Sequence, residues 1–157
     1  MEKIPVTAPG FARLEAELKQ LKAVDRPHVI QAIAEARAHG DLSENAEYSA
    51  AKEKQSFIEG RIKDLEAALS RADIIEVTTI RHAHIVFGAT VHLVDAETEE
   101  EVVYQIVGDY EADIRERRIS ISAPMARALI GKRTGDAVEV KTPKGTKEYE
   151  VLRVLYE

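Results

Sequence analysis

Three carboxylates lie close together in the segment "HGDLSENAEY", residues 39–48, which contains Asp41, Glu44 and Glu47. Carboxylate oxygens are the protein ligands that Mg²⁺ prefers, and one or two are usually enough because water and phosphate oxygens complete its coordination shell. In a two-metal site such an ion activates water and stabilises the leaving oxygen of a phosphoryl reaction. The segment could therefore bring metal-binding oxygens to a site that already holds nucleotide phosphates.

The same segment also has a structural interpretation as the start of a helix. Asp41 and Glu44 have the spacing of a capping box, with Asp in place of Ser or Thr. Ser43 is a second candidate N-cap, and acidic residues are favoured near a helix N-terminus by its dipole. The spacing alone favours capping, although a cap would also fix the carboxylate geometry that metal binding needs.

Apolar residues on both sides of this segment recur at the helical steps of three and four. Before it they are Phe11, Leu14, Leu18, Leu21, Val29, Ile30, Ile33 and Ala36. After it the same stripe runs through Tyr48, Ala51, Gln55, Ile58, Ile62, Leu65, Leu69 and Ala72. Neither stripe can be buried alone, so the two helices are predicted to form an antiparallel hairpin.

The ends of the two arms can be predicted from single residues. Thr7 is a candidate N-cap and Pro9 suits a first helical turn. Pro27 favours a kink or break, and Gly40 fits a helix C-terminus. Each arm is about 40 Å long at a rise of about 1.5 Å per residue, so the acidic segment should form the far tip of the hairpin.

The second half of the chain changes to a strand-like pattern. The stretches "VFGATVHLVD" and "EEVVYQIVGD" are rich in β-branched residues, and "RRISISAP" is another short strand candidate. The stretch "PMARALIG" predicts one short helix, and "DAVEVKTPKGTKEYEVLRVLYE" predicts a β-hairpin that turns at residues 142–145. We therefore expect a compact, mostly antiparallel β domain with one helix, joined to the hairpin by residues 73–80.

Composition limits the possible classes of protein. The chain has 157 residues, 45% hydrophobic and 32% charged, with a formal net charge of −6. A net acidic chain is a poor general nucleic-acid binder, so any such contact should be local or guided by a partner. There is no cysteine, no signal-peptide pattern and no apolar run long enough for a membrane span, so we expect a cytoplasmic protein.

The segment Gly-Asp-Leu-x-Glu-Asn-Ala-Glu-Tyr and the residues around it resemble the bacterial transcript cleavage factors of the Gre family, of the GreA type. The resemblance continues through "GRIKDLEA", "VFGATV", "IVGDYEAD", "APMARALIG" and "VKTPKG" and covers the whole chain. It implies an α+β fold, in which an antiparallel coiled-coil hairpin (residues 1–75, acidic tip at 40–47) precedes an FKBP-like β-rich domain with a short helix (residues 80–157).

The resemblance also implies a function. Gre factors bind bacterial RNA polymerase, insert the coiled coil into its secondary channel and stimulate the polymerase's own cleavage of the 3′ end of backtracked RNA. This chain is then expected to be a monomer and not an enzyme. It would have no cofactor of its own and would act with the Mg²⁺ of the polymerase active site.

Matching the tip motif residue by residue assigns roles to its side chains. Asp41 and Glu44 would be the functional carboxylates: Asp41 would contact the ion directly or through water, and Glu44 would share it or orient the attacking water. Tyr48 would pack against the tip or touch the RNA end, or it is simply the first stripe residue of the second arm. Asn45 and Glu47 belong to the motif and would shape the tip.

Two further groups of residues match surfaces known in the family. Arg37 and Lys52 match a basic patch that contacts extruded RNA, although both could be ordinary solvated helix charges. Ser120, Ser122 and Pro124 match the loop that docks on the β′ subunit of polymerase, although a strand end followed by a helix start would look the same.

Other interpretations remain open from the sequence. The chain could be a relative that enters the channel and inhibits, a structural coiled-coil adaptor, or a free metal-dependent nuclease. His82 and His84 could share one strand face and bind a metal, but no third ligand lies near them in the sequence.

Overall fold

The computed structural model describes residues 2–40 and 45–157, so Asp41 and Glu44 lie outside the described residues. The chain forms two compact units, one made of residues 12–71 and the other of residues 2–11 together with 72–157. The helical unit is thus inserted into the sheet-containing unit. The predicted first domain, residues 1–75, included segments at both of its ends that the structure groups with the sheet.

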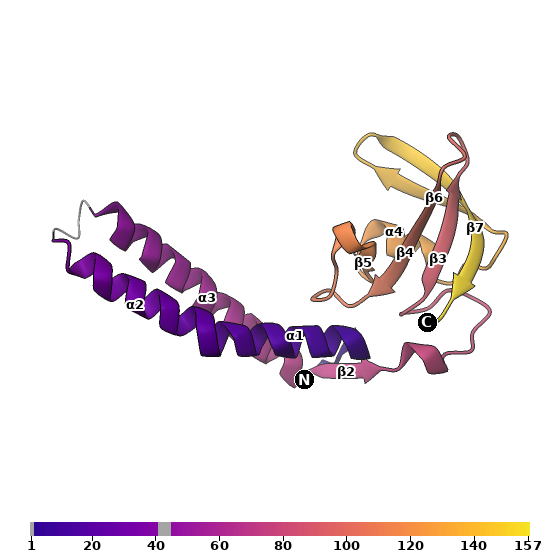
Figure 1. The fold of residues 1–157 in the computed structure, drawn as a ribbon. Helices are drawn as coiled ribbons and strands as arrows, with labels where there is room; N and C mark the ends of the chain where they lie inside the picture. The colour runs from indigo at the N-terminus through magenta and orange to yellow at the C-terminus, as the bar shows by residue number, and fades with distance from the viewer. Residues whose placement is uncertain (1, 41–44) are drawn as a thin grey trace. The chain divides into compact units, whose positions relative to one another are not determined.

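The helical unit is an antiparallel hairpin, as predicted (Figure 1). Its elements are α1 (Ala8–Gln20), the π-helical segment η1 (Leu21–Asp25), α2 (Arg26–Arg37) and α3 (Ala46–Ser70). The residues buried between the arms are Leu14, Leu21, Val29, Ile33, Ala36, Ala51, Ile58, Ile62, Leu65 and Ala68. Most of the predicted apolar stripe is therefore confirmed, but Ile30 is 53% exposed and Ala68, which was not in the predicted stripe, is buried. The predicted stripe also ran too far, because Ala72 belongs to a strand and not to the helix.

The helix continues through the segment before Pro27, where a kink or break was expected. The N–H of Arg26 donates to the carbonyl of Leu21, five residues back, which is the hydrogen-bond pattern of a π-helix. Proline has no N–H to donate and its ring needs space in the preceding turn. The wider π turn accommodates both requirements, so the chain does not break there; the alternative, a kink, stays a prediction.

Ion pairs connect the two arms outside the apolar stripe. Arg26 donates two hydrogen bonds of 2.8 Å to Glu59, and Arg61 donates bonds of 2.6 and 2.9 Å to Glu17. The hydrogen bonds from these arginines lower the pKa of both carboxyl groups below their ordinary values. Forked arginine–carboxylate pairs have defined geometry, so they help to fix the register of the arms.

A two-stranded parallel ribbon begins and ends the helical insertion. Its strands are β1 (Ile4–Thr7) and β2 (Ala72–Ile75), with Ile4 opposite Ala72. Parallel strands need a long crossover connection, and here the hairpin provides it. Neither strand was predicted: residues 73–80, expected to be a connection, form most of β2 and then the 3₁₀ turn η2 (Val77–Thr79).

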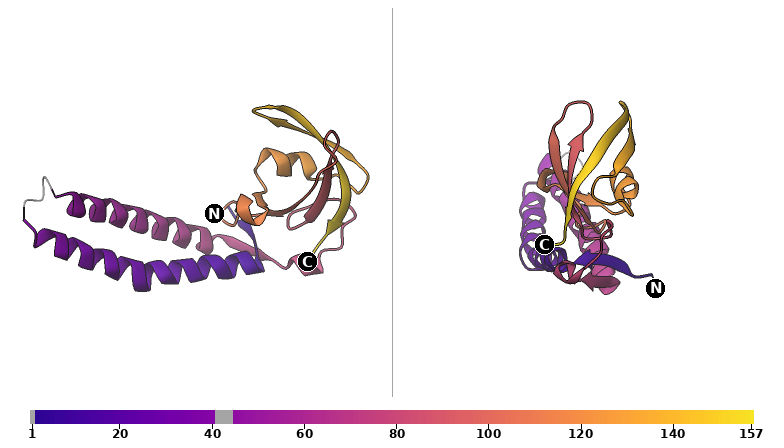
Figure 2. Two further views of the ribbon diagram at one scale, coloured as in Figure 1. Left: turned by 45° about the horizontal axis from the view of Figure 1, so that its top comes forward. Right: turned by 90° about the vertical axis from the view of Figure 1, so that its right-hand side faces the viewer.

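The main sheet has five strands in the order β5-β4-β3-β7-β6. Figure 2 shows this curled sheet from two further sides. The elements are β3 (Thr90–Asp95), β4 (Glu101–Val107), the 3₁₀ turn η3 (Ile114–Glu116), β5 (Arg118–Ser120), α4 (Pro124–Leu129), β6 (Ala137–Thr142) and β7 (Gly145–Leu155). All pairs are antiparallel except β4–β5. Helix α4 packs on the curled sheet over a core that includes Val91, Leu93, Ile106, Leu129 and Val151. The predicted α+β fold, a helical hairpin followed by a β-rich unit with one short helix, is confirmed.

Buried Glu111 ties β1 to the loop after β4 within the sheet unit. Its carboxylate accepts hydrogen bonds from the N–H of Gly108 (2.8 Å), the N–H of Thr7 (3.1 Å) and the Thr7 hydroxyl. The Thr7 hydroxyl oxygen accepts from the N–H of Gly10 at 3.1 Å, which confirms Thr7 as the N-cap of α1. The first turn of α1 is thereby held by the sheet unit.

None of the described helices is long and apolar enough to cross a membrane.

Candidate functional site

Asn45 caps α3 where the chain re-enters the hairpin. Its side-chain oxygen accepts a hydrogen bond from the N–H of Tyr48 at 3.0 Å, and its side-chain nitrogen donates to the carbonyl of Ala36 at 2.7 Å. One side chain therefore starts the second arm and holds it against the last turn of the first. Gly40 has a φ of +111°, which agrees with the predicted helix end.

The N-cap of α3 is therefore not the one that the sequence suggested. Asp41, Ser43 and Glu44 were considered as caps, but α3 begins at Ala46 and Asn45 has the extended backbone of an N-cap, with φ −87° and ψ 101°. Asn is among the best N-cap residues. The spacing of Asp41 and Glu44 favoured an acidic capping box in the sequence, but both residues lie outside the described part of the chain.

Arg37 and Lys52, the predicted RNA-contacting residues, line one groove on the hairpin. The groove has a volume of about 240 Å³ and is also lined by the apolar residues Ile30, Ile33 and Ala34. The ammonium group of Lys52 donates to Gln55, which also lines the groove, at 3.3 Å. Two residues 15 positions apart in the sequence are thus brought to one surface.

Tyr48 is half-buried next to this groove's arginine. The guanidinium carbon of Arg37 lies 6.0 Å from the centre of the Tyr48 ring, at the outer limit of a cation–π contact. Tyr48 thus contacts a predicted RNA-binding residue and also lies in the apolar stripe, so both of its predicted roles remain open.

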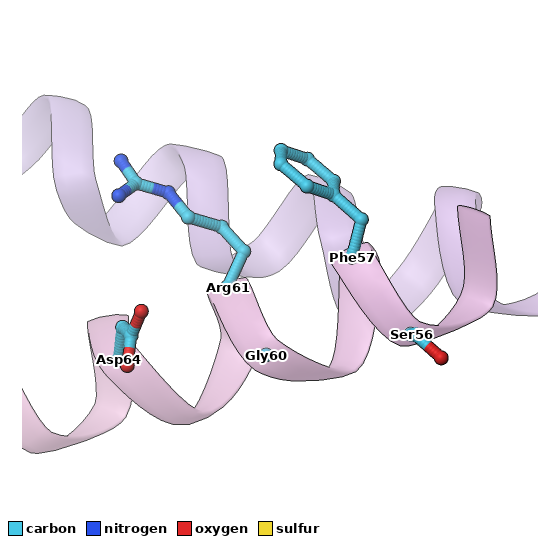
Figure 3. A pocket seen from close by; sticks show the side chains of 5 residues that line it. All are labelled: Ser56, Phe57, Gly60, Arg61 and Asp64. Carbon is cyan, nitrogen blue, oxygen red and sulfur yellow. The ribbon is translucent and has the colours of Figure 1, made fainter. Parts of the chain in front are cut away.

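A second hollow of about 410 Å³ lies on α3 (Figure 3). Phe57 and Arg61, four residues apart, project from the same side of the helix, and Gly60 between them has no side chain to fill the space. The Phe57 ring is 72% exposed. The sequence pattern placed Phe57 outside the apolar stripe, which agrees with this exposure.

Ser120 and Ser122, two of the predicted docking residues, meet at the end of β5. Both hydroxyl groups donate to one carboxylate oxygen of Asp109, that of Ser122 at 2.8 Å, and the two hydroxyl oxygens are 2.8 Å apart. These hydroxyls lower the pKa of Asp109 below its ordinary value. Sequence reasoning missed Asp109, although a polar Gly-Asp pair directly after a buried strand was a visible signal.

Pro124, the third predicted docking residue, is exposed at the start of α4. The N-cap before it is Ala123, whose side chain makes no capping hydrogen bond. The chain turns instead through a backbone bond of 2.9 Å from the N–H of Ala123 to the carbonyl of Ser120. The helix start is thus joined to the cluster of Ser120, Ser122 and Asp109, called the serine cluster below.

No group of three or more acidic, His or Cys side chains that could hold a metal ion is found in residues 2–40 and 45–157. His82 and His84 have ring centres 5.2 Å apart, without a third ligand in that part of the chain. Asp41 and Glu44 are outside the residues to which this result applies.

Two family models match the chain. "Transcription elongation factor, N-terminal" matches residues 4–74, and "Transcription elongation factor, GreA/GreB, C-term" matches residues 80–156. The chain is 64% identical over 156 residues to transcription elongation factor GreA of Ruegeria pomeroyi, with 99% of each covered. It is 60% identical over 156 residues to GreA of Rhodospirillum rubrum, again with 99% of each covered.

Solved structures of similar sequence also exist. GreA factor homolog 1 of Thermus thermophilus is 30% identical, with 98% of this chain and 99% of that chain covered and a TM-score of 0.45. The two family models together match nearly the whole chain, and the curated relatives match it end to end. The chain therefore belongs to the GreA/GreB family of transcription elongation factors.

Proposed function

We propose that this transcription elongation factor binds bacterial RNA polymerase, enters its secondary channel with the helical hairpin and stimulates the polymerase's own cleavage of backtracked RNA. Family membership and the unbroken motif from Gly40 to Tyr48 support the proposal. The inhibitory alternative is not favoured, because the curated relatives matched over their full length are named transcription elongation factor GreA.

The observation that carries this proposal is the N-cap of α3. Asn45 supplies that cap, so helix capping at α3 does not account for the carboxylates of Asp41 and Glu44. Carboxylate oxygens suit a site where phosphate oxygens and water complete the shell of a Mg²⁺ ion.

In this mechanism the hairpin supplies two kinds of group to the polymerase. Asp41 and Glu44 would supply carboxylate oxygens: Asp41 would contact the ion directly or through water, and Glu44 would share the ion or orient the attacking water. The Mg²⁺ of the polymerase active site would supply Lewis acidity and an activated water. Arg37 and Lys52 approach the extruded RNA from the groove that they line, where opposite charge attracts its phosphates.

The factor itself is then not a nuclease. Its partners are the polymerase, with the β′ subunit as the docking surface for Ser120, Ser122 and Pro124, and the 3′ end of the nascent RNA. It works as a monomer in the cytoplasm, where the polymerase is found. The only metal involved is that of the polymerase active site.

The test is a stalled, backtracked polymerase complex with labelled RNA. We expect the wild-type protein to accelerate 3′ cleavage and Asp41→Asn to reduce that acceleration by about 10²-fold or more, because the metal-directed charge is lost. The matched control is Glu53→Gln, which removes one exposed charge from α3 and should leave cleavage unchanged.

Two results would contradict the proposal. One is Asp41→Asn that binds polymerase and stimulates cleavage as well as the wild type. The other is RNA cut by the protein and Mg²⁺ alone, without polymerase, which would identify a free nuclease.

A further inference from the structure

Asp109 lies at the centre of the serine cluster that precedes α4. It follows β4 by two residues and is exposed. One of its carboxylate oxygens accepts both serine hydroxyls, and the N–H of Ser122 donates to the Ser120 hydroxyl oxygen at 3.1 Å. Asp109 thereby braces the segment between β5 and α4 from a separate loop.

This arrangement leaves hydrogen-bond acceptors on Asp109 and Ser122, both of which are exposed. A serine hydroxyl has one proton and two lone pairs, and both protons point to Asp109. Hydrogen bonds from hydroxyl groups favour the charged form of a carboxyl, and the lowered pKa of Asp109 agrees with that. The cluster therefore carries a full negative charge at neutral pH.

No cation within the described part of the chain neutralises this charge. The ion pairs found there involve Glu17, Glu59, Glu66, Asp95 and Asp113. Asp109 is not among them, so its charge is balanced by two neutral hydroxyls and solvent. An exposed, braced group of acceptors suits a partner that brings a cation and several donors.

We propose that Asp109, Ser120 and Ser122 together form a receptor for a cationic side chain of RNA polymerase. The guanidinium of an arginine matches best, because its planar fork can reach the carboxylate and a serine oxygen at once. The brace holds the acceptors in place before binding, which lowers the entropy cost of docking. This inference rests on the proposed function and adds the chemistry of the partner residue and the role of Asp109.

The test is the affinity of the full-length protein for bacterial RNA polymerase as a function of salt concentration. Asp109→Asn keeps the side-chain oxygen that accepts the hydroxyls and removes only the charge. We expect its Kd to rise about tenfold at low salt and to depend less on salt than that of the wild type, because one ion pair is lost. At saturating concentration it should still stimulate cleavage at the wild-type rate, since the hairpin tip is unchanged.

The control for a general charge effect is Glu139→Gln, which removes one exposed charge from β6 in the same unit and should bind as the wild type does. A second variant, Ser120→Ala with Ser122→Ala, leaves the Asp109 carboxylate charged but removes the two hydroxyl groups that donate to it. It should bind more weakly than the wild type but keep the wild-type salt dependence.

The outcomes separate this inference from the proposed function. If the wild type binds and stimulates cleavage but Asp109→Asn binds equally well, the inference is wrong and the proposed function stands. An Asp109→Asn defect of the same size at every salt concentration would show a brace without a cation site, and would also overturn the inference. A wild-type protein that does not bind polymerase would overturn both.

Discussion

Asn45 uses both ends of its amide at the end of the hairpin, one as the α3 cap and one as a donor to Ala36. We expect Asn45→Ala to lower the free energy of unfolding by about 1 kcal/mol, because the cap is lost, in thermal or urea unfolding. Asn45→Asp keeps an acceptor for the N–H of Tyr48 but cannot donate to Ala36. Its free energy of unfolding should therefore lie between those of the wild type and Asn45→Ala. Equal stability of all three proteins would show that neither bond contributes.

The carboxyl group of Asp109 should make the free energy of unfolding depend on pH. Its folded pKa lies below the ordinary 3.8 because two serine hydroxyls donate to it. Its contribution to stability is therefore fully present above the unfolded pKa and is lost as pH falls through the folded pKa. The difference in unfolding free energy between wild type and Asp109→Asn should be constant above about pH 5 and should shrink below about pH 4.

Helix α3 offers a matched pair of neighbouring residues on its buried and exposed faces. Ile58 is 2% exposed and Phe57 is 72% exposed. We expect Ile58→Ala to destabilise the hairpin by about 2–5 kcal/mol, since it leaves a cavity between the arms. Phe57→Ala should change stability by less than about 0.5 kcal/mol. Denaturant unfolding followed by helical circular dichroism measures both, and a large effect of Phe57→Ala would show that this ring is covered in solution.

At the scale of the whole chain, the helical hairpin is an insertion between two adjacent parallel strands. The strand before it is held by Glu111 and by the close approach of Gly108 to Pro5. An alanine methyl at position 108 would lie 2.4 Å from the carbonyl oxygen of Pro5, and backbone cannot move aside as a flexible side chain can. Gly108→Ala should therefore cost about 1–3 kcal/mol in the unfolding of the sheet unit.

The control for that substitution is Gly60→Ala. Gly60 lies inside α3 with nothing within 4 Å of an added methyl. Alanine favours helix over glycine by about 0.5–1 kcal/mol, so the control should be stabilised. A Gly108→Ala protein as stable as the wild type would contradict the prediction, because the added methyl group would then have found space beside Pro5.

Much of the fold could be predicted because it depends on local pattern. The two helical stripes, the turn at Gly40, the cap at Thr7, the short helix after Pro124 and the final β-hairpin all follow from side-chain period and from residues with special backbone preferences. The parallel β1–β2 ribbon could not be predicted, since each strand has four residues and its partner lies 68 positions away. The π-helical segment was missed because proline was expected to end the helical hydrogen bonding rather than to widen it.

By itself the sequence determined the helical hairpin, the β-rich unit and, through the motif from Gly40 to Tyr48, the family. Only the tertiary structure decided which side chain caps α3, that Arg37 and Lys52 share one groove, and that Asp109 joins Ser120 and Ser122. The reason is physical: periodicity and turn preferences act between near neighbours along the chain, whereas a groove or a shared carboxylate depends on which elements pack together.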